Sequence, residues 1–333
     1  MTLSPSTRTA PTMGALLTTL ALASPAAAAG TAPVERALQP TTASTAFVAS
    51  IGDGTRAWTT QDTTAGDAPV VLWTTTADGA PRRVASIAPV AASGVDGLEV
   101  GASSDGIPVA ALATHTAGGA RGLRLVRLDT GAVRRISSTR RGEPIGGMAI
   151  DHGRLSYALQ GGTGRKARRS TLWRAPLRAT SIGRATRVRT SAAGEQWRRV
   201  VADRGRIAVE AARPVRDGSG ISATVRWRFG TPRGTWRRTA RTVQSDGGYL
   251  RIDAAGFTAD RHALVTVQEQ EDGGPTVSRL PLAGGAVRTT TLGDQGQGIL
   301  RVPALDPATG RLLTRDLDAA GDVVVGTSAV LFR

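Results

Sequence analysis

Short runs of alternating apolar and polar residues fill the chain from about residue 45 onward, and none repeats with the 3.6-residue period of an amphipathic helix. The runs are rich in Val, Ile, Thr and Trp and stop at turns that carry Gly or Asp. Such runs are typical of β-strands joined as hairpins. In the first unit they cover residues 46–51, 56–59, 70–75 and 83–87. The pattern predicts an all-β protein.

The same order of strands and turns recurs six times along the chain. In each unit the first hairpin closes at a turn that carries Asp, usually with Gly, and successive turns lie about 50 residues apart. A repeat of this length without helical periodicity indicates a β-propeller blade. We therefore predict a six-bladed β-propeller with four-stranded antiparallel blades. The turns begin at Asp53, Asp105, Asp151, Asp203, Asp260 and Asp306.

The sixth repeat is the shortest, and its final predicted strand covers residues 329–332. A ring of sheets protects its strand edges only when its two ends are joined. Either the sixth unit is complete in itself, or a strand from residues 31–51 joins it. The expected units span residues 45–90, 93–140, 145–192, 196–245, 248–294 and 298–333.

The N-terminal region differs from the repeats. Residues 13–23 are apolar and are followed by four alanines at 26–29, which is the pattern of a signal peptide that is too short to span a membrane. An Ala/Thr-rich leader without that role is the alternative. We expect a signal peptide at 1–29, a flexible lead-in at 30–44 and the propeller domain at 45–333. No later apolar run reaches the length of about 18 residues that a membrane helix needs.

The turn sequences carry a family resemblance. Ser103-Ser104-Asp105-Gly106 precedes a strand, and diverged copies stand at Asp151, Asp203 and Asp306. This repeat resembles that of the TolB-type and WD40-like six-bladed propellers of bacterial envelopes. The chain departs from the family pattern because the usual Pro before Asp is missing, and because Asp260-Arg261 lacks Gly.

Charge is distributed unevenly. Residues 121–241, which we call the Arg-rich sector, contain 29 basic and 7 acidic residues, whereas the rest of the chain contains 13 and 19. The net charges are therefore +22 and −6. Such a sector attracts polyanions. Lys166 is the only Lys, and this Arg preference also indicates a GC-rich genome, such as that of an actinobacterium, whose proteins carry Arg on solvated strands.

Two kinds of side chain in this sector are candidates for binding. Arg guanidinium groups would contact phosphate or carboxylate, and Trp rings would add stacking. Three other Trp residues, Trp73, Trp173 and Trp227, share one place in their units and are expected to pack between blades. The candidate binding residues are Arg165, Lys166, Arg168, Arg169, Trp197, Arg198, Arg199, Trp236, Arg237 and Arg238.

Residues for catalysis or metal binding do not stand out. His115, His152 and His262 lack metal-ligand spacing and no nucleophile elbow accompanies them. The chain has no Cys, which excludes disulfides, thiol catalysis and a lipid-modified Cys anchor. Glu269 and Glu271 could hold a cation at a propeller mouth, but a solvated loop is favoured. We predict no catalytic residue, no metal and no cofactor.

These observations favour an exported, non-catalytic binding or scaffold module, either secreted or associated with the cell wall. Its expected partner is a protein or an anionic envelope polymer, and export disfavours nucleic acid. The alternative is a propeller-fold hydrolase or lyase with its site at the central mouth. That alternative requires a His or carboxylate pair that converges on the axis with perturbed pKa values.

Export should shorten the chain. We expect cleavage after Ala29, so that the secreted protein begins at Gly30, because the alanines at 26–29 follow the apolar segment directly. Intact-mass measurement of protein from the culture medium checks this. Exported protein that retains Met1 would contradict the prediction.

Overall fold

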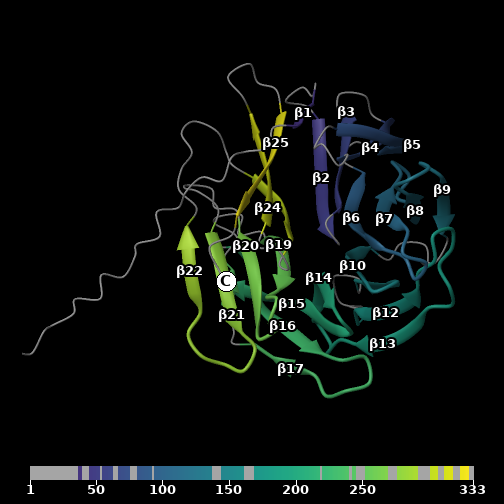
Figure 1. The fold of residues 1–333 in the computed structure, drawn as a ribbon. Helices are drawn as coiled ribbons and strands as arrows, with labels where there is room; N and C mark the ends of the chain where they lie inside the picture. Colours follow the sequence, from purple (N-terminus) through teal and green to yellow (C-terminus); the bar gives the residue numbers. More distant parts are fainter. Residues whose placement is uncertain are drawn as a thin grey trace, which may run out of the picture. The chain divides into compact units, whose positions relative to one another are not determined.

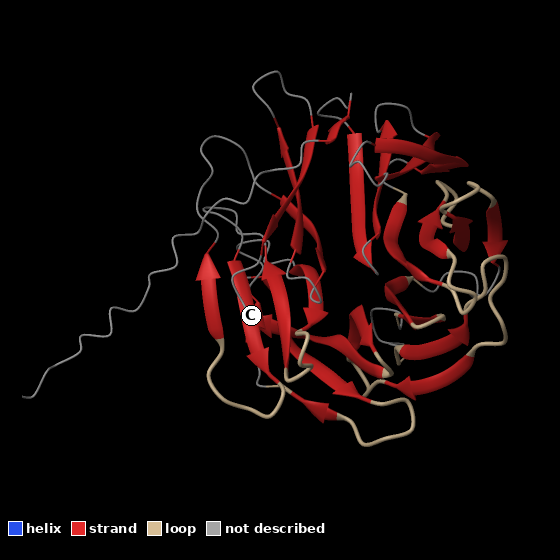
Figure 2. Ribbon diagram, viewed as in Figure 1, coloured by secondary structure: helices blue, strands red, loops and turns tan. Residues whose placement is uncertain are grey.

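In the computed structural model of the chain, the described residues form strands, turns and loops and contain no helix (Figures 1 and 2). No segment among them is therefore a helix that could cross a membrane. The described residues are 37–39, 45–52, 55–62, 67–75, 81–91, 94–136, 144–160, 169–217, 220–239, 242–244, 252–268, 276–291, 301–306, 311–317 and 323–329.

Within these residues the strands form six antiparallel sheets. The first two sheets contain β2 (Thr45–Gly52), β3 (Thr55–Asp62), β4 (Asp67–Thr75), β5 (Pro81–Ala91), β6 (Val95–Ala102), β7 (Pro108–His115), β8 (Arg121–Arg127) and β9 (Val133–Ile136). The third and fourth contain β10 (Ile145–Asp151), β11 (Arg154–Leu159), β12 (Thr171–Pro176), β13 (Thr186–Thr190), β14 (Gln196–Asp203), β15 (Arg206–Asp217), β16 (Gly220–Gly230), β17 (Arg237–Arg238) and β18 (Thr242–Gln244). The fifth and sixth contain β19 (Ile252–Phe257), β20 (Ala263–Gln268), β21 (Thr276–Pro281), β22 (Arg288–Thr291), β23 (Arg301–Asp306), β24 (Arg311–Leu317), β25 (Val323–Ala329) and β1 (Ala37–Gln39).

The first strand of each consecutive unit lies beside the first strand of the next. β2 contacts β6, β6 contacts β10, β10 contacts β14, β14 contacts β19 and β19 contacts β23. β23 in turn contacts β2. We call these six the inner strands. Their cyclic order confirms the predicted β-propeller, and the sheet boundaries follow the six predicted units closely.

The ring closes through the N-terminal part of the domain. β1 pairs antiparallel with β25, with Leu38 opposite Val324. The sixth sheet therefore takes its fourth strand from the segment predicted as a lead-in, which is the second of the two closures considered above. The last described strand ends at Ala329, earlier than the predicted strand at 329–332, of which the remainder lies outside the described residues.

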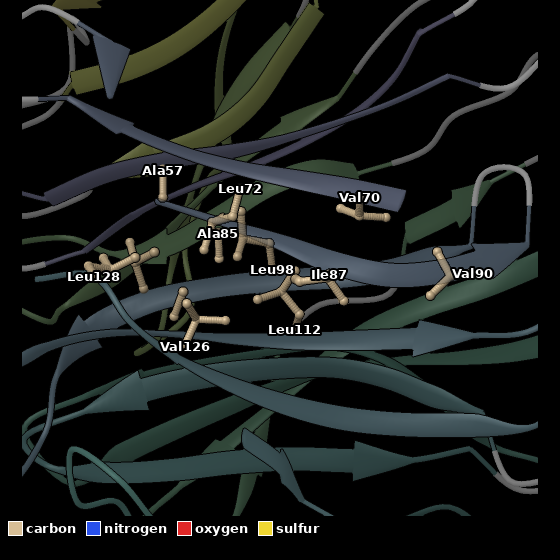
Figure 3. Packing of buried hydrophobic residues seen from close by; sticks show 12 residues of the cluster. Ala57, Val70, Leu72, Ala85, Ile87, Val90, Leu98, Leu112, Val126 and Leu128 are labelled. Carbon is tan, nitrogen blue, oxygen red and sulfur yellow. The ribbon is translucent and has the colours of Figure 1, made fainter. Parts of the chain in front are cut away.

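Apolar side chains hold neighbouring sheets together. Leu98 of β6 packs in one cluster with Leu72 and Ile87 of the first sheet (Figure 3). Trp227 on β16 is 2% exposed and packs against Phe257 of the fifth sheet, as predicted for packing between blades. Alternation within each strand produces this arrangement, because successive side chains point to opposite faces of the sheet.

The Asp-containing turns of the third and fourth sheets are tight two-residue hairpins. His152 and Gly153 have φ angles of 46° and 68°, and Arg204 and Gly205 have φ angles of 44° and 79°. Two successive positive φ values define the type I′ turn, which matches the twist of the flanking strands. Gly is favoured at such positions because other residues reach them only at some cost.

Asp151 joins these two turns. Its carboxylate accepts hydrogen bonds from the backbone N–H of Arg204 at 2.7 Å and of Gly205 at 2.8 Å, both in the next sheet's turn. It also accepts from Arg174 at 3.1 Å and lies 2.6 Å from His152 Nδ1. The carboxylate is buried. Asp260 caps its own turn by accepting from the backbone N–H of His262, whereas Asp151 binds the neighbouring turn.

Replacement of Asp151 by Ala should destabilise the fold by about 3–5 kcal/mol, because it leaves Arg174 and two backbone N–H groups without their buried acceptor. Urea unfolding measures this loss. Asp129→Ala is the matched control, since Asp129 is exposed and contacts Arg127 within the same hairpin. Equal unfolding midpoints for the two variants would show that the contact between turns contributes little.

Candidate functional site

Exposed arginines gather on the outermost strands of three consecutive sheets. β9 carries Arg134 and Arg135, β13 carries Arg187, and β17 carries Arg237 and Arg238. All five residues are exposed. We call these five residues the outer arginine band. They belong to the second, third and fourth sheets. Residues of the Arg-rich sector form all or part of each of these sheets.

The charges of the outer arginine band are not neutralised by carboxylates in the described part of the chain, where none of the five forms an ion pair. Arginines nearer the sheet interior behave differently, since Arg174 pairs with Asp151 and Arg228 with Glu195. The charge of this band also acts on an arginine nearer the sheet interior. The pKa of Arg124 is lowered by burial and by the positive charge of Arg135. Charges on edge strands also hinder pairing with a second chain, which is a structural role that such arginines can serve.

The Trp candidates occupy different surroundings from those predicted. Trp197 is 1% exposed, and its indole N–H donates to Glu195 at 2.8 Å, so its ring packs in the core and cannot stack on a ligand. Trp236 is partly buried, donates to the carbonyl of Thr231 at 2.8 Å and carries the guanidinium of Arg189 at 5.3 Å from its ring centre. That cation–π contact already covers one face of the ring.

The basic candidates are divided between two parts of the propeller. Arg169 is exposed before β12, whereas Arg165, Lys166 and Arg168 lie outside the described residues. Arg198 and Arg199 belong to an inner strand, β14, and not to the outer arginine band. The register of β14 on β15 shifts between Trp197 and Val200, which marks a β-bulge at the two arginines. Bulges of this kind redirect side chains.

A charged group that the sequence analysis did not single out lies near this bulge. Glu99 is on the inner strand β6, and its Oε2 accepts a hydrogen bond of 3.4 Å from Ser50 Oγ on β2. Burial raises the pKa of Glu99 to about 8, although Arg199 and the Ser50 hydroxyl favour its ionised form. Two neighbouring inner strands thus bring a hydroxyl and a carboxyl group together, and the charge of Arg199 on a third inner strand acts on the carboxyl group. The sequence signal was a lone acid between Leu98 and Val100.

The described His residues do not converge on this region. His152 and His262 are exposed in hairpin turns, and the side chain of His152 is 67% exposed. His115, the last residue of β7, contacts Asp96 at 3.0 Å. Glu269 and Glu271 lie outside the described residues. Within the described residues no cluster of acids and histidines could hold a metal ion.

Comparison with known proteins supports the fold. No protein-family model matches the chain, and no curated protein matches it by sequence. A solved subtype N11 neuraminidase-like protein of an H18N11 strain from a flat-faced bat in Peru is 10% identical, with a TM-score of 0.51 over 89% of this chain and 88% of that one. The GH74 xyloglucanase from Xanthomonas campestris is 14% identical, with a TM-score of 0.50 over 84% of this chain and 43% of that one.

TolB from Acinetobacter baumannii is 13% identical, with a TM-score of 0.47 over 82% of this chain. This chain spans 63% of the TolB chain. The similar structures include β-propeller proteins, as the turn motifs led us to expect. At such identities the likeness concerns the fold alone.

The raised pKa of Glu99 makes stability depend on pH. Between its ordinary pKa of 4.5 and about 8, the folded protein holds a proton that the unfolded chain has released. Rising pH through this window therefore lowers the free energy of unfolding, by up to a few kcal/mol on the scale of about 1.4 kcal/mol per pKa unit.

Glu99→Gln should remove this contribution, because an amide does not ionise. Thermal unfolding of both proteins at a series of pH values between about 5 and 9 isolates the effect as the difference between the two curves. Parallel curves would mean that Glu99 is ionised in the folded protein.

Proposed function

We propose that the protein is an exported, non-catalytic β-propeller that binds an anionic envelope polymer, or the acidic face of a protein, through the outer arginine band. The observation that carries this proposal is the exposure of the five arginines on adjacent sheets without ion pairs to described carboxylates. Their sector has a net charge of +22, whereas the rest of the chain has −6. The band thus belongs to the positive part of an unevenly charged molecule.

The chemistry of Arg suits such a partner. A guanidinium presents a planar fork of N–H donors that matches phosphate and carboxylate oxygens. Each exposed ion pair contributes only about 0–1 kcal/mol, but a polymer with many charges forms several at once. Binding also releases counterions, so that affinity falls steeply as salt increases. Multivalent, salt-sensitive attraction is therefore the expected mode of binding.

The cellular setting is part of the proposal. The expected signal peptide at 1–29 would place the propeller outside the cytoplasm, as a secreted or wall-associated protein of an actinobacterium. Phosphodiester polymers of the envelope would be the accessible polyanions there, and nucleic acid would not. A hydrolase or lyase receives less support, because the groups that act on Glu99 are Ser50 and Arg199, and neither is the second acid or His that such a site requires.

Two double variants test the proposal with matched positions. Arg134→Gln with Arg237→Gln removes two charges from the outer arginine band. Arg83→Gln with Arg288→Gln removes two exposed charges from the outermost strands of the first and fifth sheets. Binding of a glycerol-phosphate teichoic acid and of inorganic polyphosphate is measured between about 50 and 200 mM salt.

The first variant should bind more weakly and lose about 1.5 from the slope of log affinity against log salt, since each lost phosphate contact removes roughly 0.7–0.9. The second variant should behave like the unaltered protein. Equal losses in both variants would show that overall charge, and not the outer arginine band, determines binding. An affinity that does not depend on salt would also contradict the proposal.

A further inference from the structure

Two arginines of the second sheet stand directly opposite each other on neighbouring strands. Arg124 on β8 is the register partner of Arg135 on β9, and we call these two residues the opposed arginine pair. Directly opposed residues of antiparallel strands share one face of the sheet, with their Cβ atoms about 4.5–5.5 Å apart. Burial lowers the pKa of Arg124, and so does the positive charge of Arg135. Opposed like charges destabilise a sheet, so the pair favours a compensating negative charge.

The two side chains lean toward the same place on this face. Arg124 Nε donates a hydrogen bond of 3.4 Å to Thr114 Oγ1 on β7. Gly122 is the register partner of Thr114, and a Cβ atom at Gly122 would lie 3.9 Å from Arg135 Nε. Apart from its chain neighbours, no other heavy atom of the described residues lies within 4 Å of that Cβ position. Gly122 thus leaves open space beside both arginine side chains.

The described carboxylates do not compensate for these two positive charges. Neither member of the opposed arginine pair forms an ion pair within the described part of the chain. On the same sheet, Asp96 pairs with Arg121, and Asp129 pairs with Arg127. Leu112, which lies on the same face as the opposed arginine pair, belongs to the apolar core between the first and second sheets. A negative charge for the pair would therefore come from a bound anion.

We propose that the opposed arginine pair binds one tetrahedral dianion, either sulfate or a phosphate monoester, in the open space at Gly122. Two guanidinium groups supply two positive charges and planar sets of N–H donors, which match the charge and the oxygen atoms of such an anion. Thr114 accepts from Arg124 and so holds that side chain in position. The site goes beyond the proposed function, because it takes a single small anion. It shares Arg135 with the outer arginine band but needs no polymer.

Equilibrium dialysis with radiolabelled sulfate at low, fixed ionic strength tests the site. Sulfate should bind saturably and at least tenfold more tightly than radiolabelled acetate, which carries a single negative charge. Methyl phosphate competes at about pH 8, where a phosphate monoester is a dianion. Competition stronger than that of unlabelled sulfate would identify a phosphate monoester as the ligand, and weaker competition would identify sulfate. Equal affinities for sulfate and acetate, or no saturable binding, would overturn the proposal.

Arg135→Gln and Arg134→Gln are matched variants. Both remove one exposed positive charge from β9, but Arg134 is opposite Leu125 and therefore lies on the other face of the sheet. Arg135→Gln should lose at least tenfold in affinity for sulfate, and Arg134→Gln should retain it. Equal sulfate affinities in the two variants would overturn the site. Failure here leaves the polymer proposal untouched, because that proposal is tested through Arg134 and Arg237.

Gly122→Val separates the site from a general effect of charge. The variant keeps the opposed arginine pair but fills the space between the two side chains, so sulfate affinity should fall at least tenfold. Its unfolding temperature without sulfate should be close to that of the natural protein, because a Cβ atom there meets Arg135 Nε at an ordinary contact distance and Val suits a strand. Unaltered sulfate affinity in the folded variant would show that the anion does not bind at Gly122, and would overturn the proposal.

Discussion

Closure of the ring is the constraint on which the rest of the structure depends. Each sheet buries its faces only against its two neighbours, so a gap between the last and the first sheet would expose apolar side chains and strand edges. The chain meets this requirement twice. The inner strands β23 and β2 lie side by side, and β1 adds to β25 so that the sixth sheet contains strands from both ends of the domain.

The position of a charged residue within this ring determines what it can do. On the outermost strands, arginines such as Arg134 and Arg237 are exposed and accessible to a large partner. On the inner strands, Arg199 is constrained by the close approach of β10 and acts on Glu99 of another sheet. In the hairpin turns, the carboxylate of Asp151 accepts hydrogen bonds from the turn of the next sheet and so fixes that sheet in place. The fold thus places charged residues in three different settings.

The repeat was predictable because alternation and Gly/Asp turns are local signals, and they recovered the six sheets. Closure by β1 was predicted only as one of two alternatives, because a strand of three residues has no period that the sequence could show. Trp197 was misassigned because its Arg neighbours suggested a surface, whereas alternation across the β-bulge turns its ring inward. Glu99 and Arg199 lie 100 positions apart, so no local sequence signal relates them, although the charge of Arg199 acts on Glu99 in the folded ring. The arginine excess was predictable, but its placement on outermost strands required the sheet order.

The pairing of β1 with β25 can be measured directly, because the chain contains no Cys of its own. Cys is introduced in pairs at the opposed positions Ala37 and Val325, Leu38 and Val324, and Gln39 and Val323, and the folded protein is oxidised. Mass spectrometry of peptides then identifies any cross-link. The account predicts a disulfide between the opposed positions in at least one pair, together with a raised unfolding temperature. Absence of every such cross-link in folded protein would contradict closure by β1.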